Sequence, residues 1–411
     1  MNKPIVIVNP FSSGSELATA FASKGVPSVA LLKDFKMESG FGNQLRKEEY
    51  IEILTYGEET IEKLRKLNPL GVIPGTDNSV DVADELAAAI TPERSNDMSK
   101  TLHRQHKALM QQALEEAGLP FIQTINTSST DEVDKWLKKN NLTHSPLIIK
   151  PPMSAGSDNV LHIPGGGNWG QAFRKVLTEP SKITKKPNQT VVVQEQVFGT
   201  EFAVGTVSAN GKHALSHIIK YNKAKTGDRI TVYDFVEFLP YDQEVHKALV
   251  EYTFNTLDAL GIKWGAAHSE IMLTADGPRL IEVGARMLGG PTVGFSREAT
   301  GKSQADRLVD VYLSGDILSQ DYEFKKNVVP VMIRAPLAGT LMNMEVFNDI
   351  DKLETLSSKH IWYKTGDTVA KTEDFLTNLG IIALAGEKKK IMEDYKKIRR
   401  MEAKIMIKRL I

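Results

Sequence analysis

The first hundred residues alternate between short apolar runs and longer stretches with helical spacing. The apolar runs are IVIV, SVALL and LGVIPG, and the helical stretches are SGSELATAFASKG and SVDVADELAAAI. Strands that alternate with helices in this way predict βαβ units with a parallel sheet. The Gly-x-Gly-x-x-Gly signature of dinucleotide-binding sheets is absent, because Gly14 stands alone after the first strand. The pattern therefore favours a parallel α/β domain at the start of the chain and disfavours a hydride-transfer enzyme.

Length and composition limit what the rest of the chain can be. A chain of 411 residues is too long for one hydrophobic core, so two to four domains are expected. Lys plus Arg and Asp plus Glu both number 51, so no net charge attracts nucleic acid or an anionic membrane. The absence of cysteine excludes disulfides and thiolate chemistry and suits a reducing cytosol. The apolar run Ile5–Val8 is too short for a signal or membrane segment, which predicts a cytoplasmic protein.

A strand followed by a loop of small residues lies at 147–158, with the sequence LIIKPPMSAGSD. The short apolar run predicts a buried strand that ends at Lys150, and two prolines then stop the strand. In the loop that follows, Ser154, Gly156 and Ser157 leave backbone amides uncovered, so the loop could close over a phosphate chain beside the lysine. An ordinary strand end with a polar loop explains this stretch equally well.

Further elements follow in a mixed order that is typical of an α+β region. The stretch HRQHKALMQQALEEAGLP has helical spacing, with Lys107 in its first half. A break rich in Pro and Lys at 178–190 precedes strands in which Asn210–Gly211 marks a hairpin. Near the end of the chain, an amphipathic helix rich in Lys and Arg follows Gly386. Such charge runs usually form a solvated face, so nucleic-acid binding is not expected there.

Two glutamates on neighbouring strands are the strongest chemical signal. Glu270 and Glu282 flank the turn ADGP, and a hairpin through that turn would place both carboxylates on one face. Two carboxylates from adjacent strands suit Mg²⁺, a cation that prefers oxygen ligands and shares its other positions with phosphate and water. If the strands stay regular, their periodicity also places His268 on the same face as Glu270 and Arg286 on the same face as Glu282. The alternative is a pair of exposed glutamates, which repel each other and are disfavoured without a cation.

Taken in order along the chain, these motifs resemble the ATP-grasp superfamily. They comprise two lysines, the small-residue loop, QEQVFGTEF, Glu270 and EVGARMLGG, and the similarity covers about residues 1–320. The resemblance implies an α/β and α+β protein with the ATP-grasp fold. This fold has an N-terminal Rossmann-like βαβ domain, two subdomains that grip ATP, and here a C-terminal α+β region. The expected domains are 1–98, 99–187, 188–325 and 326–411.

ATP and Mg²⁺ are the ligands that this resemblance implies, with Mn²⁺ as a substitute metal. Lys107 and Lys150 would contact the α- and β-phosphates, and Glu270 and Glu282 would hold the metal. The rest of the implied nucleotide site comprises the phosphate-covering residues Ser154, Gly156 and Ser157, the adenine-facing residues Glu195 and Val197, and Glu201 on the ribose hydroxyls.

Within the superfamily, several segments are most similar to the L-amino acid ligases, which join two amino acids into a dipeptide. These segments are GSD, GAAHSEIML, GPRLIEVGAR, APLAGT and KTGD. In that family a carboxylate attacks the γ-phosphate of ATP, and an amine then displaces phosphate from the acyl phosphate. Arg286 would hold the transferred phosphate and the oxyanion, and the amides of Gly289 and Gly290 would assist. His268 would border the amino-acid pocket. A plain turn at the two glycines and a structural role for the histidine are the alternatives.

Two positions depart from the superfamily pattern. Gly284 stands where many members have an asparagine two residues after the second metal glutamate, so either one metal ligand must come from water or phosphate, or the metal affinity is lower. His106 stands where an aspartate often precedes the first lysine, a difference with little expected consequence.

The expected activity is an ADP-forming ligase that joins two L-amino acids into a dipeptide. One alternative is an ATP-grasp ligase or carboxylase for another carboxylate or for bicarbonate, as in purine synthesis or biotin carboxylation. The other is a nucleotide-binding module without catalysis, against which both metal glutamates and Arg286 argue. Amino acids are the expected partners, with neither nucleic acid nor membrane, and a homodimer is compatible with the resemblance.

Overall fold

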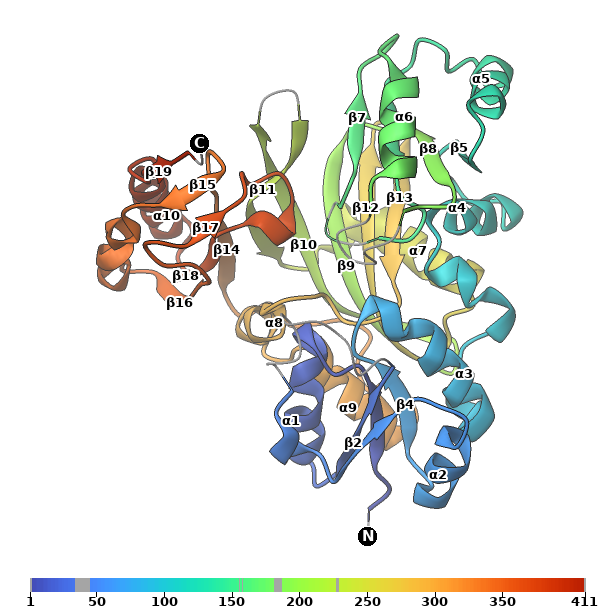
Figure 1. The fold of residues 1–411 in the computed structure, drawn as a ribbon. Coiled ribbons are helices and arrows are strands. Elements are labelled where there is room, and N and C mark those ends of the chain that lie inside the picture. Colours follow the sequence, from blue (N-terminus) through green and yellow to red (C-terminus); the bar gives the residue numbers. More distant parts are fainter. Residues whose placement is uncertain are drawn as a thin grey trace. The chain divides into compact units, whose positions relative to one another are not determined.

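The structure, a computed structural model, describes residues 2–33, 45–154, 156, 158–180, 187–226 and 229–409. The chain divides into two compact units, whose elements are labelled in Figure 1. The first unit comprises Met1–Thr124, Val197–Ile218 and Pro240–Glu323, and the second comprises Ile125–Gln196, Ile219–Leu239 and Phe324–Ile411. Each unit is therefore assembled from three segments that are far apart in sequence.

A parallel four-stranded sheet begins the first unit, as the alternating sequence pattern predicts. Its strand order is β3, β2, β1, β4. Successive residues of a strand face opposite sides of a sheet, and in β1 the pair Ile5 and Ile7 packs with α1 and α9, whereas Val6 and Val8 pack with α2 and α3. The bounds are β1 Ile5–Val8, α1 Glu16–Ala22, β2 Ser28–Leu32, β3 Glu52–Thr55, α2 Thr60–Leu67, β4 Gly71–Pro74, α3 Val80–Ile90 and α9 Gln304–Ser314.

The loops after β1 and β4 meet at the carboxyl edge of this sheet. A Cβ atom added at Gly75 would come within 2.3 Å of the Asn9 carbonyl oxygen, and one added at Gly14 within 2.6 Å of the Gly75 backbone. Only glycine allows the two backbones to approach so closely. The two loops therefore pack directly against each other at the sheet edge where ligands usually bind in α/β proteins.

Antiparallel strands make up the rest of the first unit, in the order β13, β12, β9 and β10, of which β10 continues into the second unit. The predicted hairpin between β9 and β10 is present, and both turn residues, Asn210 and Gly211, have the positive φ that such turns need. Helices α4 and α7 pack against β13. The bounds are α4 Lys107–Glu116, β9 Thr200–Ala209, β10 Lys212–Thr226, α7 Gln243–Ala259, β12 Gly265–Thr274, β13 Gly277–Gly284 and α8 Thr292–Thr300.

The second unit contains a four-stranded sheet in the order β5, β8, β6, β7, with α5 and α6 in the same hydrophobic core. The predicted strand at 147–150 is β6, and the predicted break at 178–190 begins where α6 ends, although 181–186 lie outside the described residues. The bounds are β5 Thr124–Thr127, α5 Thr130–Lys139, β6 Leu147–Lys150, β7 Leu161–Ile163, α6 Trp169–Thr178 and β8 Val191–Glu195.

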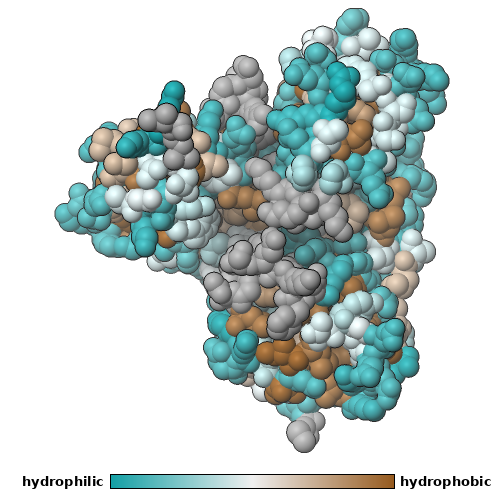
Figure 2. All heavy atoms as spheres, viewed as in Figure 1, coloured by the Kyte–Doolittle hydropathy of each residue, from teal (hydrophilic) through white to brown (hydrophobic). Residues whose placement is uncertain are grey.

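The C-terminal part of the second unit contains the strands β11, β14, β18 and β16 in that order, a small sheet of β17, β15 and β19, and α10. The predicted amphipathic helix is α10, which buries Ile391 and Ile398, and Figure 2 shows both hydrophilic and hydrophobic residues on the visible face of the C-terminal region. The bounds are β11 Arg229–Leu239, β14 Asn327–Ile333, β15 Gly339–Leu341, β16 Leu356–Ile361, β17 Thr368–Val369, β18 Gly380–Gly386, α10 Lys388–Glu402 and β19 Ile407–Lys408.

Short 3-10 helices lie between these elements. They are η1 Ser12–Ser15, η3 Lys47–Glu49, η4 Asp77–Ser79, η5 Pro92–Arg94, η6 Met98–Lys100, η7 Leu102–Arg104, η8 Met344–Lys352 and η9 Phe375–Thr377. Among the described residues, no helix has the length and hydropathy needed to cross a membrane. The four domain boundaries expected from the sequence stay predictions.

Candidate active site

Two glutamates face each other across the β12–β13 hairpin. Glu270 on β12 is the direct cross-strand partner of Glu282 on β13, so the predicted pairing of these strands is confirmed. A register shift follows between Glu270 and Ile271. Both side chains are mostly buried, with 16% of the Glu270 side chain and 24% of the Glu282 side chain exposed. Because like charges directly opposite each other are destabilising, this pair needs compensating charge nearby.

A lysine and a histidine lie against these carboxylates. Lys107 Nζ is 2.9 Å from Glu282 Oε2, and only 9% of the lysine side chain is exposed. His268 Nε2 is 3.3 Å from Glu270 Oε1. The structure thus brings together four residues that the sequence analysis proposed for the site, from α4, β12 and β13.

The helix that carries Lys107 is capped by the residue before it. His106 has extended backbone geometry, and its ring nitrogen Nδ1 accepts a hydrogen bond from Leu109 N at 3.4 Å. Burial lowers the pKa of His106, which favours the neutral ring that can accept this bond. His106 therefore takes over the capping role that aspartate fills well, which explains why this departure from the superfamily pattern has little structural consequence.

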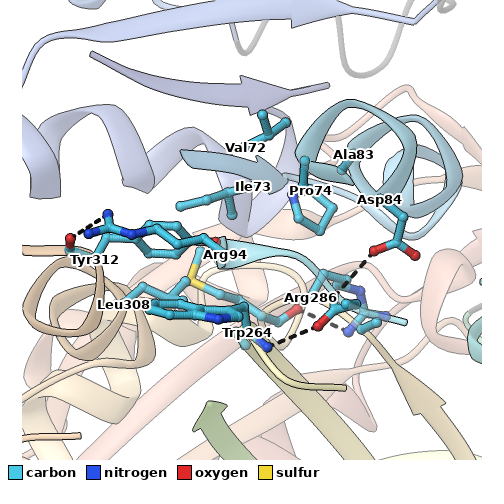
Figure 3. Close-up of a pocket in the computed structure, with 16 residues that line it drawn as sticks. Val72, Ile73, Pro74, Ala83, Asp84, Arg94, Trp264, Arg286, Leu308 and Tyr312 are labelled. Carbon is cyan, nitrogen blue, oxygen red and sulfur yellow. Dashed lines mark hydrogen bonds between the residues drawn. The ribbon is translucent and has the colours of Figure 1, made fainter. Parts of the chain in front are cut away.

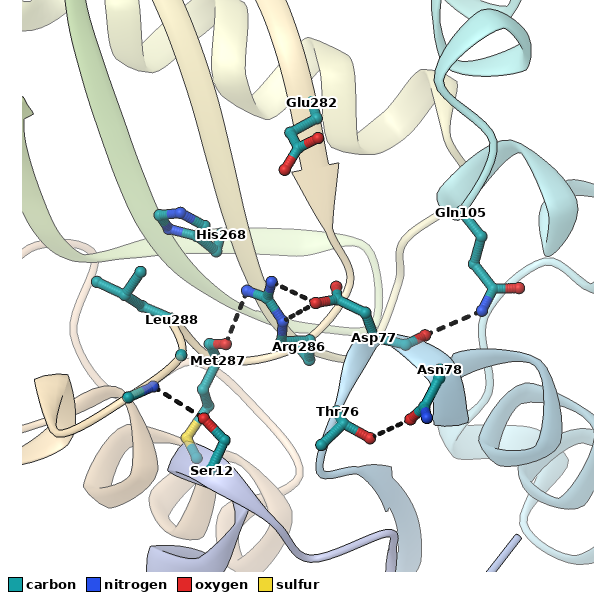
Figure 4. Close-up of polar contacts among 12 residues, drawn as sticks. Ser12, Thr76, Asp77, Asn78, Gln105, His268, Glu282, Arg286, Met287 and Leu288 are labelled. Atoms are coloured by element: carbon teal, nitrogen blue, oxygen red, sulfur yellow. Dashed lines mark hydrogen bonds and ion pairs between the residues drawn. The ribbon is translucent and has the colours of Figure 1, made fainter. Parts of the chain in front are cut away.

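Arg286 follows β13 and pairs with Asp77, the first residue of η4 on the loop after β4 (Figure 4). Asp77 Oδ2 accepts hydrogen bonds from Arg286 Nε at 2.9 Å and from Nη2 at 2.5 Å, and the Met287 carbonyl accepts one from Nη1 at 3.0 Å. Burial opposes the guanidinium charge, but the charge and hydrogen bonds of Asp77, with smaller effects of Glu282 and Glu270, outweigh burial, and the pKa of Arg286 is raised. Arg286 is thus held as a mostly buried cation.

Gly284 is the last residue of β13, and because it has no side chain, the Arg286 side chain can occupy the space beside it. A Cβ atom added at Gly284 would lie 2.8 Å from Arg286 Cζ, 2.9 Å from its Nη1 and 3.0 Å from Asp77 Oδ1. These separations are well below an ordinary contact between carbon atoms. The asparagine that many superfamily members have at this position would therefore collide with the Arg286–Asp77 pair.

The segment after Arg286 contacts the loop that follows β1. Gly290 N donates a hydrogen bond to Ser12 Oγ at 2.9 Å, which is drawn as a dashed line at the labelled Ser12 in Figure 4. Gly290 has a φ of 73°, a conformation that favours glycine, and a Cβ atom added at Gly289 would lie 3.7 Å from the same oxygen. In this structure the Gly290 amide is therefore engaged with Ser12. The catalytic roles of Gly289 and Gly290 stay predictions.

Two further nucleotide-site candidates, Val197 and Glu201, belong to the first unit. Glu201 on β9 pairs with Met272 of β12, and Ala203 pairs with Glu270. Cross-strand partners point to the same face of a sheet, and so do residues two apart on one strand. Glu201 therefore lies on the same face of the sheet as Glu270, where the sequence analysis expects the nucleotide.

The remaining candidates belong to the second unit. Lys150 ends β6 and is buried, and its Nζ donates a hydrogen bond to Gln194 Oε1 at 2.9 Å. In the loop that follows, Ser154 Oγ bonds to Asp158 Oδ2 at 3.1 Å, and Gly156 has a φ of 66°. Glu195 is the last residue of β8. Ser157 lies outside the described residues, so its predicted role has no structural test.

Asp77, Gln105 and Ser12 take part in the site, and the sequence analysis did not single them out. Gln105 Nε2 donates a hydrogen bond to the Asp77 carbonyl at 3.0 Å. Asp77 and Ser12 both follow strands of the parallel sheet, on loops at its carboxyl edge. That position after a predicted strand is the signal that could have identified them.

The donor set fits a divalent cation that is shared with phosphate. Three carboxylates, Asp77, Glu270 and Glu282, lie near two cations, Lys107 and Arg286. Within the described part of the chain, no group of three or more His, Cys, Asp or Glu side chains could hold a metal by itself. Glu270 and Glu282 could supply two oxygen ligands, and Mg²⁺ usually takes one or two carboxylates plus phosphate and water.

A small cavity beside Arg286 is lined by residues of β4, α3 and the start of β12 (Figure 3). Its volume is about 20 Å³, which is enough for about one water molecule. Arg94, Trp264 and Tyr312 line it together with Arg286, and the Arg94 guanidinium lies 5.5 Å from the centre of the Trp264 ring. This cavity is too small for an amino acid and is not a substrate pocket.

Comparison with known proteins agrees with this geometry. The ATP-grasp domain family matches residues 143–294. Dapdiamide A synthase from Enterobacter agglomerans is 28% identical over 389 residues, which cover 92% of this chain and 90% of the relative.

Solved structures with the same fold extend over nearly the whole chain. The L-amino acid ligase from Bacillus licheniformis superposes with a TM-score of 0.71 at 18% identity, covering 100% of this chain and 99% of the other. The N5-carboxyaminoimidazole synthetase from Staphylococcus aureus, solved with ADP, gives a TM-score of 0.68 at 13% identity, covering 98% and 99%. Residues 143–294 therefore match the ATP-grasp domain, and the chain has the ATP-grasp fold.

Proposed function

We propose that the protein is an ADP-forming ligase that joins the carboxyl group of one L-amino acid to the amine of another. The observation that carries this proposal is the cluster of Glu270, Glu282, Lys107 and Arg286 around the β12–β13 hairpin. Carboxylates for a metal, a lysine and an arginine are the groups with which proteins position and stabilise a transferred phosphate. The likeness in sequence to dapdiamide A synthase and in fold to an L-amino acid ligase supports a ligase that uses amino acids.

The proposed reaction has two steps. A carboxylate oxygen of the first amino acid attacks the γ-phosphorus of ATP, the bond from that phosphorus to the β-phosphate oxygen breaks, and ADP leaves. The amine nitrogen of the second amino acid then attacks the acyl carbon, the bond to the phosphate oxygen breaks, and the amine loses a proton as the amide forms. When bound, Mg²⁺ would supply positive charge at the phosphate oxygens.

The residues of this chain would hold and orient the reacting groups. Glu270 and Glu282 would bind the metal through their oxygens, and Lys107 would offer its charge to the phosphates of ATP. Arg286 would bind oxygens of the transferred phosphate and of the tetrahedral oxyanion, because a guanidinium can contact two oxygens at once. Lys150 and the loop with Ser154, Gly156 and Ser157 would bind the nucleotide phosphates, as the resemblance implies. Glu195, Val197 and Glu201 would contact its adenosine part, and His268 would border the amino-acid pocket.

ADP release with pairs of amino acids tests this function. The protein is incubated with ATP, Mg²⁺ and each pair of the twenty amino acids, and the products of active pairs are identified by mass spectrometry. We expect ADP only when two amino acids are present, with a product whose mass equals their sum less one water. Parallel reactions replace the second amino acid by ammonia or bicarbonate.

Each alternative function gives a different result in this assay. ADP release that needs ammonia or bicarbonate, with no dipeptide, would show a different ligase or a carboxylase. ATP binding by calorimetry without ADP release under any condition would show a nucleotide-binding module. A cytoplasmic location and a homodimer stay predictions, which cell fractionation and light scattering can check.

A further inference from the structure

The contact between Asp77 and Arg286 fixes the guanidinium at three points. Asp77 Oδ2 accepts from Nε and Nη2, at 2.9 and 2.5 Å, and the Met287 carbonyl accepts from Nη1 at 3.0 Å. A guanidinium has five N–H groups in one plane. Among the described residues, acceptors are found for these three, which leaves one N–H on each terminal nitrogen. The plane of Arg286 is thus set while two donors remain for oxygens of a substrate.

The backbone at Asp77 is itself held in place by its surroundings. Thr76 and Ser79 form a reciprocal capping box around η4, in which Thr76 N donates to Ser79 Oγ at 3.2 Å. Gln105 Nε2 donates to the Asp77 carbonyl at 3.0 Å. Gln105 lies two residues before Lys107. Lys107 in turn pairs with Glu282 on β13, the strand that leads to Arg286. Asp77 is therefore a fixed anchor that connects the N-terminal sheet, the start of α4 and the end of β13 (Figure 4).

Other carboxylates compete with Asp77 for the arginine. Glu282 and Glu270 both act on the charge of Arg286, although neither is its hydrogen-bond partner in the structure. Without the negative charge of Asp77, these two glutamates would draw the guanidinium toward the expected metal position. The absence of a side chain at Gly284 gives Arg286 the room to turn toward Asp77 instead.

We propose that Asp77 is a positioning residue, which holds Arg286 in the orientation that places its two remaining N–H groups on the transferred phosphate and the oxyanion. The inference rests on the proposed function and goes beyond it, because it gives a role to a residue of the N-terminal sheet. A guanidinium that contacts two oxygens at once is effective only in a fixed orientation. Asp77 acts through Arg286 and does not itself contact the reacting atoms.

The Asp77→Asn variant tests this role. Asparagine keeps the size and one acceptor oxygen but removes the charge that holds the guanidinium. With the amino-acid pair that the parent uses best, we expect kcat for ADP release to fall by about 10- to 100-fold, with the KM for ATP within about twofold of the parent. Asp77→Glu, which restores the charge one methylene away, should recover part of the loss. A merely structural role would instead lower the melting temperature and leave kcat unchanged per folded molecule.

A double-mutant cycle with Arg286→Lys shows whether Asp77 acts through the arginine. If it does, the double variant Asp77→Asn/Arg286→Lys is no slower than Arg286→Lys alone, within about twofold, because the second change removes a contact that is already lost. Asp306→Asn is the matched control, since Asp306 accepts from Arg297 Nε at 2.8 Å and from Nη2 at 2.9 Å outside the site. It should lower the melting temperature without changing kcat.

The outcomes separate this inference from the proposed function. A normal kcat in Asp77→Asn, or losses that multiply in the double variant, would overturn the positioning role while the ligase function stands. A parent that releases no ADP with any amino-acid pair would overturn the proposed function and this role with it. If Asp77→Asn is too unstable to assay, Asp77→Glu takes its place in the double-mutant cycle. Its expected loss of kcat is smaller, and Asp77→Glu/Arg286→Lys should again be no slower than Arg286→Lys alone, within about twofold.

Discussion

Replacing Gly284 by asparagine is the sharpest test of how this site differs from the superfamily pattern. If the position served as a metal ligand, Gly284→Asn would restore a missing ligand, and less Mg²⁺ would be required. In this structure the added Cβ atom alone would lie 2.8 Å from Arg286 Cζ, where carbon atoms normally stay about 3.5–4.0 Å apart. The backbone of Gly284 does not have a positive φ, so the cost arises from the contact and not from the conformation.

The expected loss of kcat follows from the hydrogen bonds to Asp77 that the Arg286 guanidinium would lose. A shift of roughly 0.7 Å or more, the difference between these separations, would weaken both hydrogen bonds to Asp77. Charge-assisted hydrogen bonds contribute about 1.5–3 kcal/mol each, so the displaced arginine would lose its fixed orientation. Loss of one oxyanion donor typically lowers kcat by about 10²–10³-fold. We therefore expect Gly284→Asn to lower kcat by about 10²-fold and to leave the Mg²⁺ requirement no lower than in the parent.

The assay is ADP release by the best amino-acid pair, titrated with Mg²⁺, with a melting curve for each variant. Gly284→Ala adds the Cβ atom alone and should produce most of the loss. Gly294→Ala is the matched control, because a Cβ atom added at Gly294 meets nothing within 4 Å. A stable Gly284→Asn protein with an unchanged kcat and a lower Mg²⁺ requirement would refute the reasoning and make position 284 a metal-ligand position.

Three further predictions concern the nucleotide, the metal and pH. Lys150→Ala should weaken ATP binding at least tenfold in calorimetry while the melting temperature shows a folded protein, since one charge-assisted contact is worth about 1.5–3 kcal/mol; unchanged affinity would contradict a phosphate contact. Glu270→Gln and Glu282→Gln should each raise the Mg²⁺ concentration needed for turnover or abolish it, and normal turnover of both at limiting Mg²⁺ would remove the metal assignment. Burial, with smaller effects of His268 and Arg307, lowers the pKa of His217 from 6.5 to about 3, so the unfolded chain takes up this proton first. The free energy of unfolding should therefore be insensitive to this group above about pH 6.5 and should fall as the pH drops from there toward 3. The free energies of unfolding of the parent and of His217→Phe are measured by denaturant titration at pH 7, 5.5 and 4.5. The free energy should fall less steeply with decreasing pH in His217→Phe than in the parent. An equal fall in both proteins would show that another group is responsible.

The parts of the site that could be predicted are those set by local sequence. The pairing of Glu270 with Glu282 follows from the turn ADGP and from strand periodicity, which are both contained in one short stretch. The position of Lys107 in the first half of a helix, and of Lys150 at the end of a strand, follows from similar local patterns, although the helix begins at Lys107 and not at His103 as expected. In each case the residues that decide the structure are close neighbours in the chain.

The Arg286–Asp77 pair could not be predicted, because its partners are 209 residues apart in sequence. The stretch around Asp77, PGTDNS, is typical of an ordinary turn after a strand and gives no sign of a distant cation. The structural role of Gly284 could not be predicted either, because it depends on the same distant pair. From the sequence it is a missing metal ligand, whereas in the structure it makes room for a side chain two residues further along the chain.

The ion pairs of this site cross the border of the segment that matches the ATP-grasp domain. Glu282 and Arg286 lie inside the matched residues 143–294, whereas their partners Lys107 and Asp77 lie outside them. Breaking a buried pair such as Lys107–Glu282 costs about 3–5 kcal/mol, and a whole domain is commonly stable by only about 5–15 kcal/mol. A fragment expressed with those borders would leave Glu282 on β13, and Arg286 just after it, without their ion-pair partners. The residues before the matched segment thus supply its counter-ions, Asp77 from the loop after β4 and Lys107 from α4, and the two parts must be produced as one polypeptide to give a stable site.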